Sequence, residues 1–282
     1  MGFYAITGLI NAIASALFGF FVILKNRKAV LNKTFAIFCF SVAVWSGGYF
    51  FWQIAENSQD ALFIFRALMI GAIFIPACYF HFVVSLVDLS KEKRKAIIFG
   101  YALSFIFFLL NFTPLFIEGM ESKLSFPFWP RPGVAFHPFL AMFFGFTIYS
   151  WYLMLKIRRQ SDETKRKQIE YVFWGTLIGF IGGSTNYFLW YNIPIPPIGN
   201  FLVVLYPVAL GYAVLKHRLF DLKVIATELL TFAILMATLI DLLMAETWQQ
   251  RLIKGGFFIF ITIFGIFLIK SVLKEVSQRE QL

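Results

Sequence analysis

Long apolar runs alternate with short polar connections along the whole chain. A helix needs about 20 apolar residues to cross the hydrocarbon core of a bilayer. The runs are continuous, whereas the strands of a membrane barrel would alternate in polarity and be about half as long. The pattern therefore predicts an all-α polytopic membrane protein with about nine spanning helices, at 3–24, 34–55, 62–87, 95–117, 137–155, 169–191, 199–215, 224–246 and 255–273.

Composition supports this interpretation. Of the 282 residues, 60% are hydrophobic and only 14% are charged, whereas an average soluble domain has about 25% charged residues. Cys39 and Cys78 both lie inside apolar runs, a placement that indicates neither a disulfide framework nor a metal site. We therefore expect no metal and no cofactor.

The lysines and arginines predict the orientation, because the cytoplasmic loops of membrane proteins are enriched in them. The connections after the first, third, fifth and seventh spans are basic, and they read KNRKAVLNK, DLSKEKRK, KIRRQSDETKRK and KHRLFDLK. The opposite side carries only Lys123, Arg131, Arg251 and Lys254. We expect the N-terminus outside and the C-terminus in the cytoplasm. The net charge of +10 then reflects topology, so the lipid bilayer is an expected partner and nucleic acid is not.

One outer connection is long. Residues 118–136 read EGMESKLSFPFWPRPGVAF and combine prolines with aromatic residues. Because proline stiffens the backbone, we expect a loop that holds its shape without regular secondary structure. This loop would either cover an outward-facing pocket or lie at the aromatic belt of the membrane interface.

Glycines spaced four apart predict a packing face in the sixth span. Gly175, Gly179 and Gly183 would let another helix approach closely. That neighbour would lie within the same bundle or, alternatively, across a dimer interface.

Ionisable side chains within the spans are few, and each is a candidate functional group because a charge in lipid is costly. Arg66 could clamp an anionic or carbonyl group with its forked guanidinium. Alternatively, it reaches the outer interface or pairs with a nearby carboxylate. His81 is either a hydrogen-bonded core residue or a ligand contact. Asp241 is expected to pair with a cation at the interface.

Three aromatic residues of the second span share one helix face. Trp45, Tyr49 and Trp52 follow the spacing i, i+4 and i+7. This face either packs in the core or lines an apolar pocket with a few polar groups, as small-molecule sites do. The predicted ligand-binding set comprises Trp45, Tyr49, Trp52, Gln53, Arg66 and His81.

Three segments resemble the N-terminal seven-transmembrane sensor region of bacterial histidine kinases. AVWSGGYFF carries Trp45, and FRALMIGAIFIPACYFHF carries Arg66, Pro76 and His81 with Phe82. The third segment, HRLFDLKVI, follows the seventh span. It matches the exit motif of the family at Arg218, Leu219, Phe220 and Asp221.

The resemblance implies that residues 1–223 sense a ligand or a membrane signal and pass it to cytoplasmic output domains. Residues 224–273 would add two spanning helices. Residues 274–282 would begin a cytoplasmic signalling helix through which two copies form a homodimer. The expected location is the cytoplasmic membrane of a bacterium.

No enzyme activity is expected within these residues. They contain no phosphate loop, no HExxH and no GxSxG motif. Family members generally continue into a helix with a phosphoacceptor histidine and an ATP-binding domain, and neither is expected here. Two alternatives to a sensory module stay open: a small transporter or permease, and a non-catalytic membrane scaffold.

Overall fold

The computed structural model describes residues 2–204, 206, 210, 231, 234–235, 238–239, 241–243, 245 and 247–279. The chain forms two compact units, Met1–Ala213 and Val214–Leu282, and each is described by itself. The first unit contains α1 (Phe3–Lys25), α2 (Val30–Gln53), α3 (Ser58–Leu86), α4 (Arg94–Leu110), β1 (Ile117–Lys123), β2 (Phe126–Pro132), α5 (Phe136–Arg158), α6 (Glu163–Ser184), α7 (Asn186–Trp190) and the 3-10 helix η1 (Ile198–Val204). The described helix of the second unit is α10 (Trp248–Arg279).

Helices dominate the described residues, as the apolar runs predicted. Within that part of the chain, five helices are long and apolar enough to cross a membrane: α1, α2, α3, α5 and α10. They match the first, second, third, fifth and ninth predicted spans. Polar caps mark two helix starts, where Asn57 accepts a hydrogen bond from the Asp60 amide (2.9 Å) and Asp162 accepts one from the Lys165 amide (2.8 Å).

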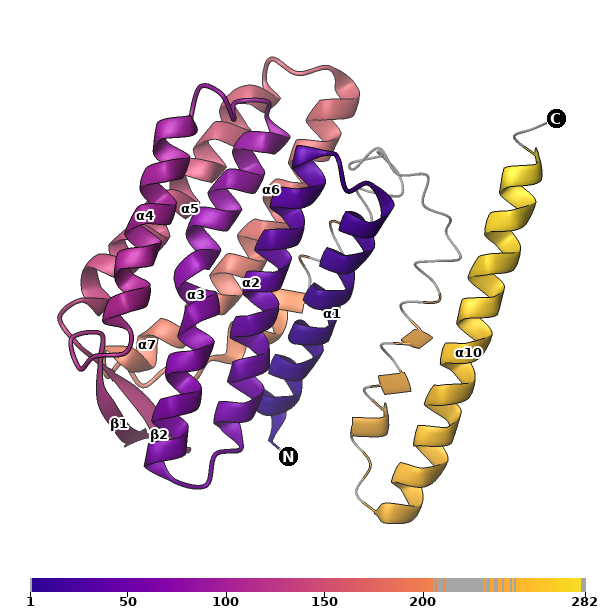
Figure 1. The fold of residues 1–282 in the computed structure, drawn as a ribbon. Coiled ribbons are helices and arrows are strands. Elements are labelled where there is room, and N and C mark those ends of the chain that lie inside the picture. The colour runs from indigo at the N-terminus through magenta and orange to yellow at the C-terminus, as the bar shows by residue number, and fades with distance from the viewer. Residues whose placement is uncertain are drawn as a thin grey trace. The chain divides into compact units, whose positions relative to one another are not determined.

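The core of the first unit lies along α3. In Figure 1, α1, α2, α3 and α4 follow one another in a row, and α5 and α6 lie behind them. Tyr79, Phe80 and Phe82 of α3 are fully buried. The rings of Phe38 and Phe82 stack with their centroids 6.3 Å apart. This central position explains why α3 is apolar around most of its circumference.

Glycines bring α2 and α3 into backbone contact. A Cβ atom at Gly71 would lie 2.5 Å from both the Ser41 carbonyl oxygen and the Trp45 nitrogen. On the facing helix, a Cβ atom at Gly48 would collide with Leu68. Small residues permit such close approach, and the contact fixes the position of Trp45 relative to α3.

The expectation of an irregular loop at 118–136 is wrong. β1 and β2 form an antiparallel hairpin in which Met120 faces Pro130 and Glu121 faces Trp129, with register irregularities on both sides of this stretch. Both strands of a hairpin are edge strands, where proline is tolerated because its missing N–H can face away from the partner. The fold is thus helical apart from one hairpin among the described residues.

Three predicted spans differ in detail from the structure. The helix expected at 95–117 ends at Leu110, and the next residue, Asn111, donates a hydrogen bond to the Arg66 carbonyl (2.7 Å). The span expected at 169–191 begins earlier, at Glu163, and breaks at Thr185. The span expected at 199–215 begins as a 3-10 helix. Much of its remainder lies outside the described residues.

The second unit supplies one long helix. α10 continues without a break for 32 residues. Lys254 of this helix forms an ion pair with Asp241 at 2.7 Å, which confirms the expected cation partner of Asp241. The predicted exit motif, Arg218, Leu219, Phe220 and Asp221, lies outside the described residues.

Candidate functional site: two neighbouring aromatic cavities

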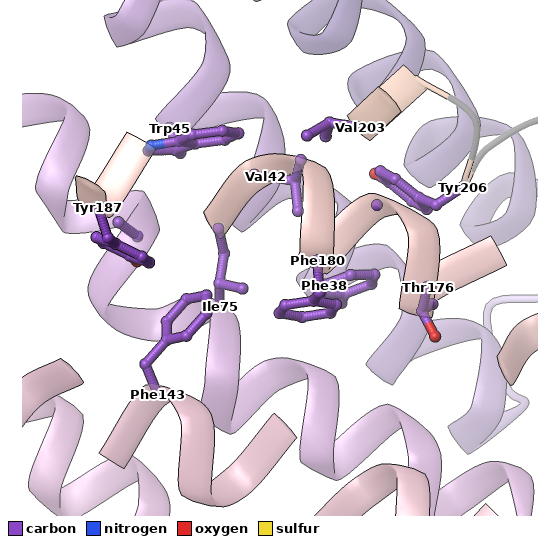
Figure 2. A pocket seen from close by; sticks show the side chains of 13 residues that line it. Phe38, Val42, Trp45, Ile75, Phe143, Thr176, Phe180, Tyr187, Val203 and Tyr206 are labelled. Carbon is purple, nitrogen blue, oxygen red and sulfur yellow. The ribbon is translucent and has the colours of Figure 1, made fainter. Parts of the chain in front are cut away.

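The larger cavity has a volume of about 60 Å³ and lies among α2, α3, α5, α6, α7 and η1. Figure 2 shows its wall, in which aromatic side chains from different helices surround a small open space. The lining residues are Phe38, Val42, Trp45, Ala72, Ile75, Phe143, Thr176, Gly179, Phe180, Gly183, Tyr187, Val203 and Tyr206.

The smaller cavity, of about 30 Å³, lies beside it. Its lining residues are Trp45, Tyr49, Trp52, Phe65, Leu68, Met69, Ala72, Trp129, Gly183, Asn186, Tyr187 and Trp190. Trp45, Ala72, Gly183 and Tyr187 line both cavities, so these four residues form the boundary between them. No charged side chain lines either cavity among the described residues.

Two polar groups of the larger cavity are already hydrogen-bonded. The Thr176 and Tyr79 hydroxyls lie 2.8 Å apart and share a hydrogen bond, and Thr176 also donates to the Val172 carbonyl (2.7 Å). Tyr206 donates to the Ser15 hydroxyl (2.7 Å). These bonds join α3 to α6, and Tyr206 to α1. They leave the hydrocarbon and ring surfaces to line the space.

The smaller cavity differs, because three of its buried polar atoms have no hydrogen-bond partner. They are the Tyr49 hydroxyl, the Trp129 Nε1 and the Asn186 Oδ1. Their residues are 2%, 1% and 7% exposed, respectively. Leaving a buried polar group unsatisfied costs about 1–3 kcal/mol. Three residues that line this cavity therefore each carry a buried polar atom whose hydrogen bonding is unsatisfied.

The hairpin provides part of this wall. Trp129 of β2 packs edge to face against Trp52 of α2, with ring centroids 5.1 Å apart. The Trp52 Nε1 donates a hydrogen bond to the Phe128 carbonyl (2.8 Å). From β1, the buried Lys123 ammonium donates to the Leu189 carbonyl (2.8 Å) in the last turn of α7. The hairpin is thus fastened to two helices that border the cavity.

A chain of amides connects the cavity wall with α1. The Asn186 amide nitrogen donates to the Asn200 Oδ1 (3.2 Å), and the Asn200 amide nitrogen donates to the Thr7 hydroxyl (3.4 Å). Asn11 donates to the Asn200 carbonyl (3.3 Å). Asn200 is 1% exposed, so this polar group lies in the interior and holds η1 against α1 and α7.

A comparison with known protein families finds a match to most of the chain. The model of the N-terminal 7TM region of histidine kinase matches residues 8–223. The chain belongs to this family. Neither a comparison with curated proteins nor one with solved structures found a match. The family and the apolar helices together make this a multi-pass membrane protein, whose matched part is the sensor region of a histidine kinase.

Within this sensor region, the six predicted ligand-binding residues separate into two groups. Trp45, Tyr49 and Trp52 line the smaller cavity together, and Trp45 also lines the larger one. Gln53 lines a third, smaller hollow next to Trp52, between α2 and the hairpin. Arg66 lines none of these three cavities.

Arg66 and His81 have other surroundings. Arg66 forms no ion pair with a described residue, and its Nε atom is buried without a hydrogen-bond partner. The Nδ1 atom of His81 lies 3.2 Å from the Tyr101 hydroxyl, a contact between α3 and α4. Of the predicted ligand-binding residues, those that line the two cavities therefore lie on the aromatic face of α2, and the ionisable Arg66 and His81 of α3 are not among them.

Two glycines of the predicted face, Gly179 and Gly183, border the larger cavity. A Cβ atom at Gly179 would make ordinary contact with Tyr206 at 3.4 Å, and one at Gly183 would lie 3.5 Å from Val203. Gly175 is buried on the same helix. The tightest approach at a glycine of α6 occurs at Gly182, where a Cβ atom would collide with the Gly199 carbonyl. Spacing by four could not identify Gly182, because it lies one residue away from the predicted face.

Sequence reasoning missed Trp129 and Tyr187 as cavity residues. Trp129 lies in the segment 118–136, which was expected to be an irregular loop. The only role that the sequence suggested for this loop in a binding site was to cover a pocket. Tyr187 lies in α7, beyond the break at Thr185. No group of three or more histidine, cysteine, aspartate or glutamate side chains is placed to hold a metal ion in the described part of the chain.

Proposed function

We propose that this sensor region is the input module of a bacterial two-component histidine kinase and that its stimulus acts in the two aromatic cavities. The observation that carries the proposal is the boundary between them. Trp45 and Tyr187 line both cavities and come from α2 and α7. A change in either side chain would alter both spaces at once.

The relay follows from which elements meet at the cavities. An occupant that favours one arrangement of α2, α6 and η1 shifts the population of the bundle toward that arrangement. Tyr206 is the lining residue nearest in sequence to the exit motif at Arg218. Movement of Tyr206 therefore reaches the exit segment through a short stretch of chain.

The proposed topology has about nine spanning helices, with the N-terminus outside and the C-terminus in the cytoplasm. The unbroken course of α10 supports the last of these spanning helices, because its 32 residues exceed the about 20 that cross a bilayer. Such a helix carries a rotation or shift out of the membrane. Two copies would meet along residues 274–282, which places the output domains side by side.

The test uses an output that the module would control. Residues 1–282 are fused in frame to the catalytic core of a histidine kinase, and autophosphorylation from ATP is measured in inverted membrane vesicles. We expect Trp45→Ala to change the basal level by about tenfold, which corresponds to about 1.4 kcal/mol in the balance of two states.

Trp174→Ala is the matched control, because Trp174 of α6 is 59% exposed and lines neither cavity. It is expected to behave like the unmodified fusion. If all three proteins are present in the membrane in equal amounts and are phosphorylated equally, the cavities take no part in signal input.

A further inference from the structure

We infer that the larger cavity binds a small, uncharged, apolar molecule and that Gly179 and Gly183 keep the space for it open. This inference rests on the proposed function and names the chemical class of its ligand. The observation behind it is that the packing around these two glycines leaves room for side chains that they lack.

Close helix packing does not require glycine at these two positions of α6. A Cβ atom at Gly179 would lie 3.4 Å from its nearest neighbour on another element, and one at Gly183 would lie 3.5 Å from its nearest neighbour. Both are ordinary van der Waals separations. At Gly182 of the same helix, by contrast, a Cβ atom would collide with the Gly199 carbonyl. The bundle therefore needs glycine at 182 and has room for alanine at 179 and 183.

Backbone conformation does not require glycine there either. No glycine of the described chain has a positive φ angle, so alanine can adopt the same backbone at both positions. Within a helix, alanine is the more favourable residue, because glycine loses more conformational freedom on folding. Gly179 and Gly183 therefore make α6 less stable, and what they provide in return is the open space beside them.

That space belongs to the larger cavity. The atoms nearest to a Cβ at Gly179 are those of Tyr206 and Val203, and the atoms nearest to a Cβ at Gly183 are those of Val203 and Trp45. All five residues line the larger cavity. A methyl group at either position would therefore take up part of its volume.

The wall of this cavity favours an apolar occupant. The Thr176 and Tyr206 hydroxyls already have protein partners. The other polar groups among the lining side chains belong to Trp45 and Tyr187, which lie at the boundary with the smaller cavity. The remaining lining side chains are hydrocarbon groups, such as Phe143 in Figure 2. Water would find few partners there, and apolar cavities stay dry.

The lining excludes ions. No charged side chain lines the larger cavity in the described part of the chain. A buried charge is tolerated only when it is paired and hydrogen-bonded. A carboxylate or an ammonium ion would find no counter-charge in this wall, so the ligand is neutral.

Volume limits the size of the ligand. The larger cavity measures about 60 Å³, which exceeds the about 10–15 Å³ that one water molecule requires. An engineered apolar cavity that binds benzene measures about 150 Å³. The ligand is therefore larger than water and smaller than benzene, as short hydrocarbons and apolar gases are.

The experiment measures binding directly, with xenon as the probe, because xenon binds apolar cavities without hydrogen bonding. The 282-residue chain is placed in phosphatidylcholine nanodiscs, and the NMR shift of dissolved xenon is followed, with empty nanodiscs as the background. We expect xenon to bind above background and cyclopropane to displace it. Benzene, which is too large, and methylammonium, which is charged, are expected not to displace it, and displacement by either would overturn the ligand class.

Alanine substitutions test the assigned space. Gly179 lines the larger cavity and not the smaller one, so Gly179→Ala is expected to weaken xenon binding about tenfold by filling the larger cavity alone. Adding Gly183→Ala should abolish binding. The matched control is Gly145→Ala in α5, at a residue that lines neither cavity. It is expected to bind xenon as the unmodified chain does.

Thermal unfolding distinguishes a filled cavity from a lost fold. Gly179→Ala should unfold at the same temperature as the unmodified chain or at a higher one, because alanine favours the helix. If Gly179→Ala is folded and binds xenon as Gly145→Ala does, the inference is overturned. Absence of xenon binding in the folded, unmodified chain also overturns it. A lower unfolding temperature for Gly179→Ala would show that packing requires this glycine and would overturn its role, while cyclopropane competition in the unmodified chain still tests the site.

The two proposals fail separately. If xenon binds as expected while Trp45→Ala leaves kinase output unchanged, the proposed function fails and the apolar site stands. If Trp45→Ala changes the output while xenon does not bind, the cavities act as an input but the ligand class is wrong.

Discussion

The Lys123 ammonium of the hairpin lies 2.8 Å from the Leu189 carbonyl oxygen, in the last turn of α7. This contact joins two segments that the sequence separates widely. Lys123 is also paired with Glu121 at 2.9 Å. A cation at a helix C-terminus is favoured by the helix dipole, so this side chain both fastens the hairpin and satisfies a carbonyl group.

Replacing Lys123 by methionine tests that fastening. The Leu189 carbonyl would lose its charged donor, and we expect the free energy of unfolding to fall by about 1–3 kcal/mol. Thermal unfolding in detergent measures the change. Lys254→Met removes an ion pair whose Asp241 side chain is 61% exposed, and such pairs contribute about 0–1 kcal/mol. Equal effects of the two substitutions would contradict the buried role of Lys123.

Tyrosines with and without partners should respond differently to loss of the hydroxyl group. Tyr206→Phe leaves the buried Ser15 hydroxyl without its donor, so we expect a loss of about 1 kcal/mol in stability. Tyr49→Phe removes a buried hydroxyl that has no partner, and its stability should be unchanged or higher by up to about 1 kcal/mol. Urea titration of both variants measures the difference. A larger loss for Tyr49→Phe would show that its hydroxyl already has a partner.

Glycine at position 71 is required by the contact between α2 and α3. In Gly71→Ala, the new methyl group meets the Ser41 carbonyl and the Trp45 nitrogen at 2.5 Å, so we expect a loss of about 1–3 kcal/mol from overpacking. At Gly145 of α5, by contrast, a Cβ atom would meet no heavy atom within 4 Å other than those of its own turn of helix. Gly145→Ala should therefore gain up to about 1 kcal/mol from helix propensity. Thermal unfolding that ranks the two variants in the opposite order would contradict the close helix contact.

Local sequence pattern was sufficient for much of the helical architecture. The runs that became α1, α2, α3, α5 and α10 are long and apolar, and hydropathy alone identifies such helices. Local sequence pattern did not predict the hairpin at 118–136, because the hairpin depends on pairing between residues of two strands, such as Glu121 and Trp129. Propensity in that stretch, rich in proline, favours no regular structure.

In the candidate site, too, the sequence predicted what lies within one helix and did not predict what depends on contacts between elements. Helical spacing placed Trp45, Tyr49 and Trp52 on one face, and all three line the smaller cavity. The other walls come from elements far away in the chain, such as Trp129 of the hairpin and Asn186 of α7. Which faces of different helices meet depends on tertiary packing, and no spacing rule within one helix contains that information.

The buried asparagine group couples α1 to the cavity wall, and this coupling can be measured. Asn200→Ala removes the side-chain partner of Asn186 and Thr7, while its backbone carbonyl still accepts from Asn11. We expect a loss of about 1–3 kcal/mol in the free energy of unfolding. In the double variant Asn186→Ala/Asn200→Ala, the losses should fall short of additivity by about 0.5–3 kcal/mol, because the two side chains share one hydrogen bond.

Asn111 provides the control for this coupling, since its amide bonds to the Arg66 carbonyl in a separate part of the bundle. Asn111→Ala combined with Asn200→Ala should give additive losses in the same urea titration, because distant sites without shared partners act independently. A fully additive result for the pair Asn186 and Asn200 would mean that the amide group is not one cooperative network. The cavity wall would then be joined to α1 by packing and by separate hydrogen bonds, such as the one from Tyr206 to Ser15.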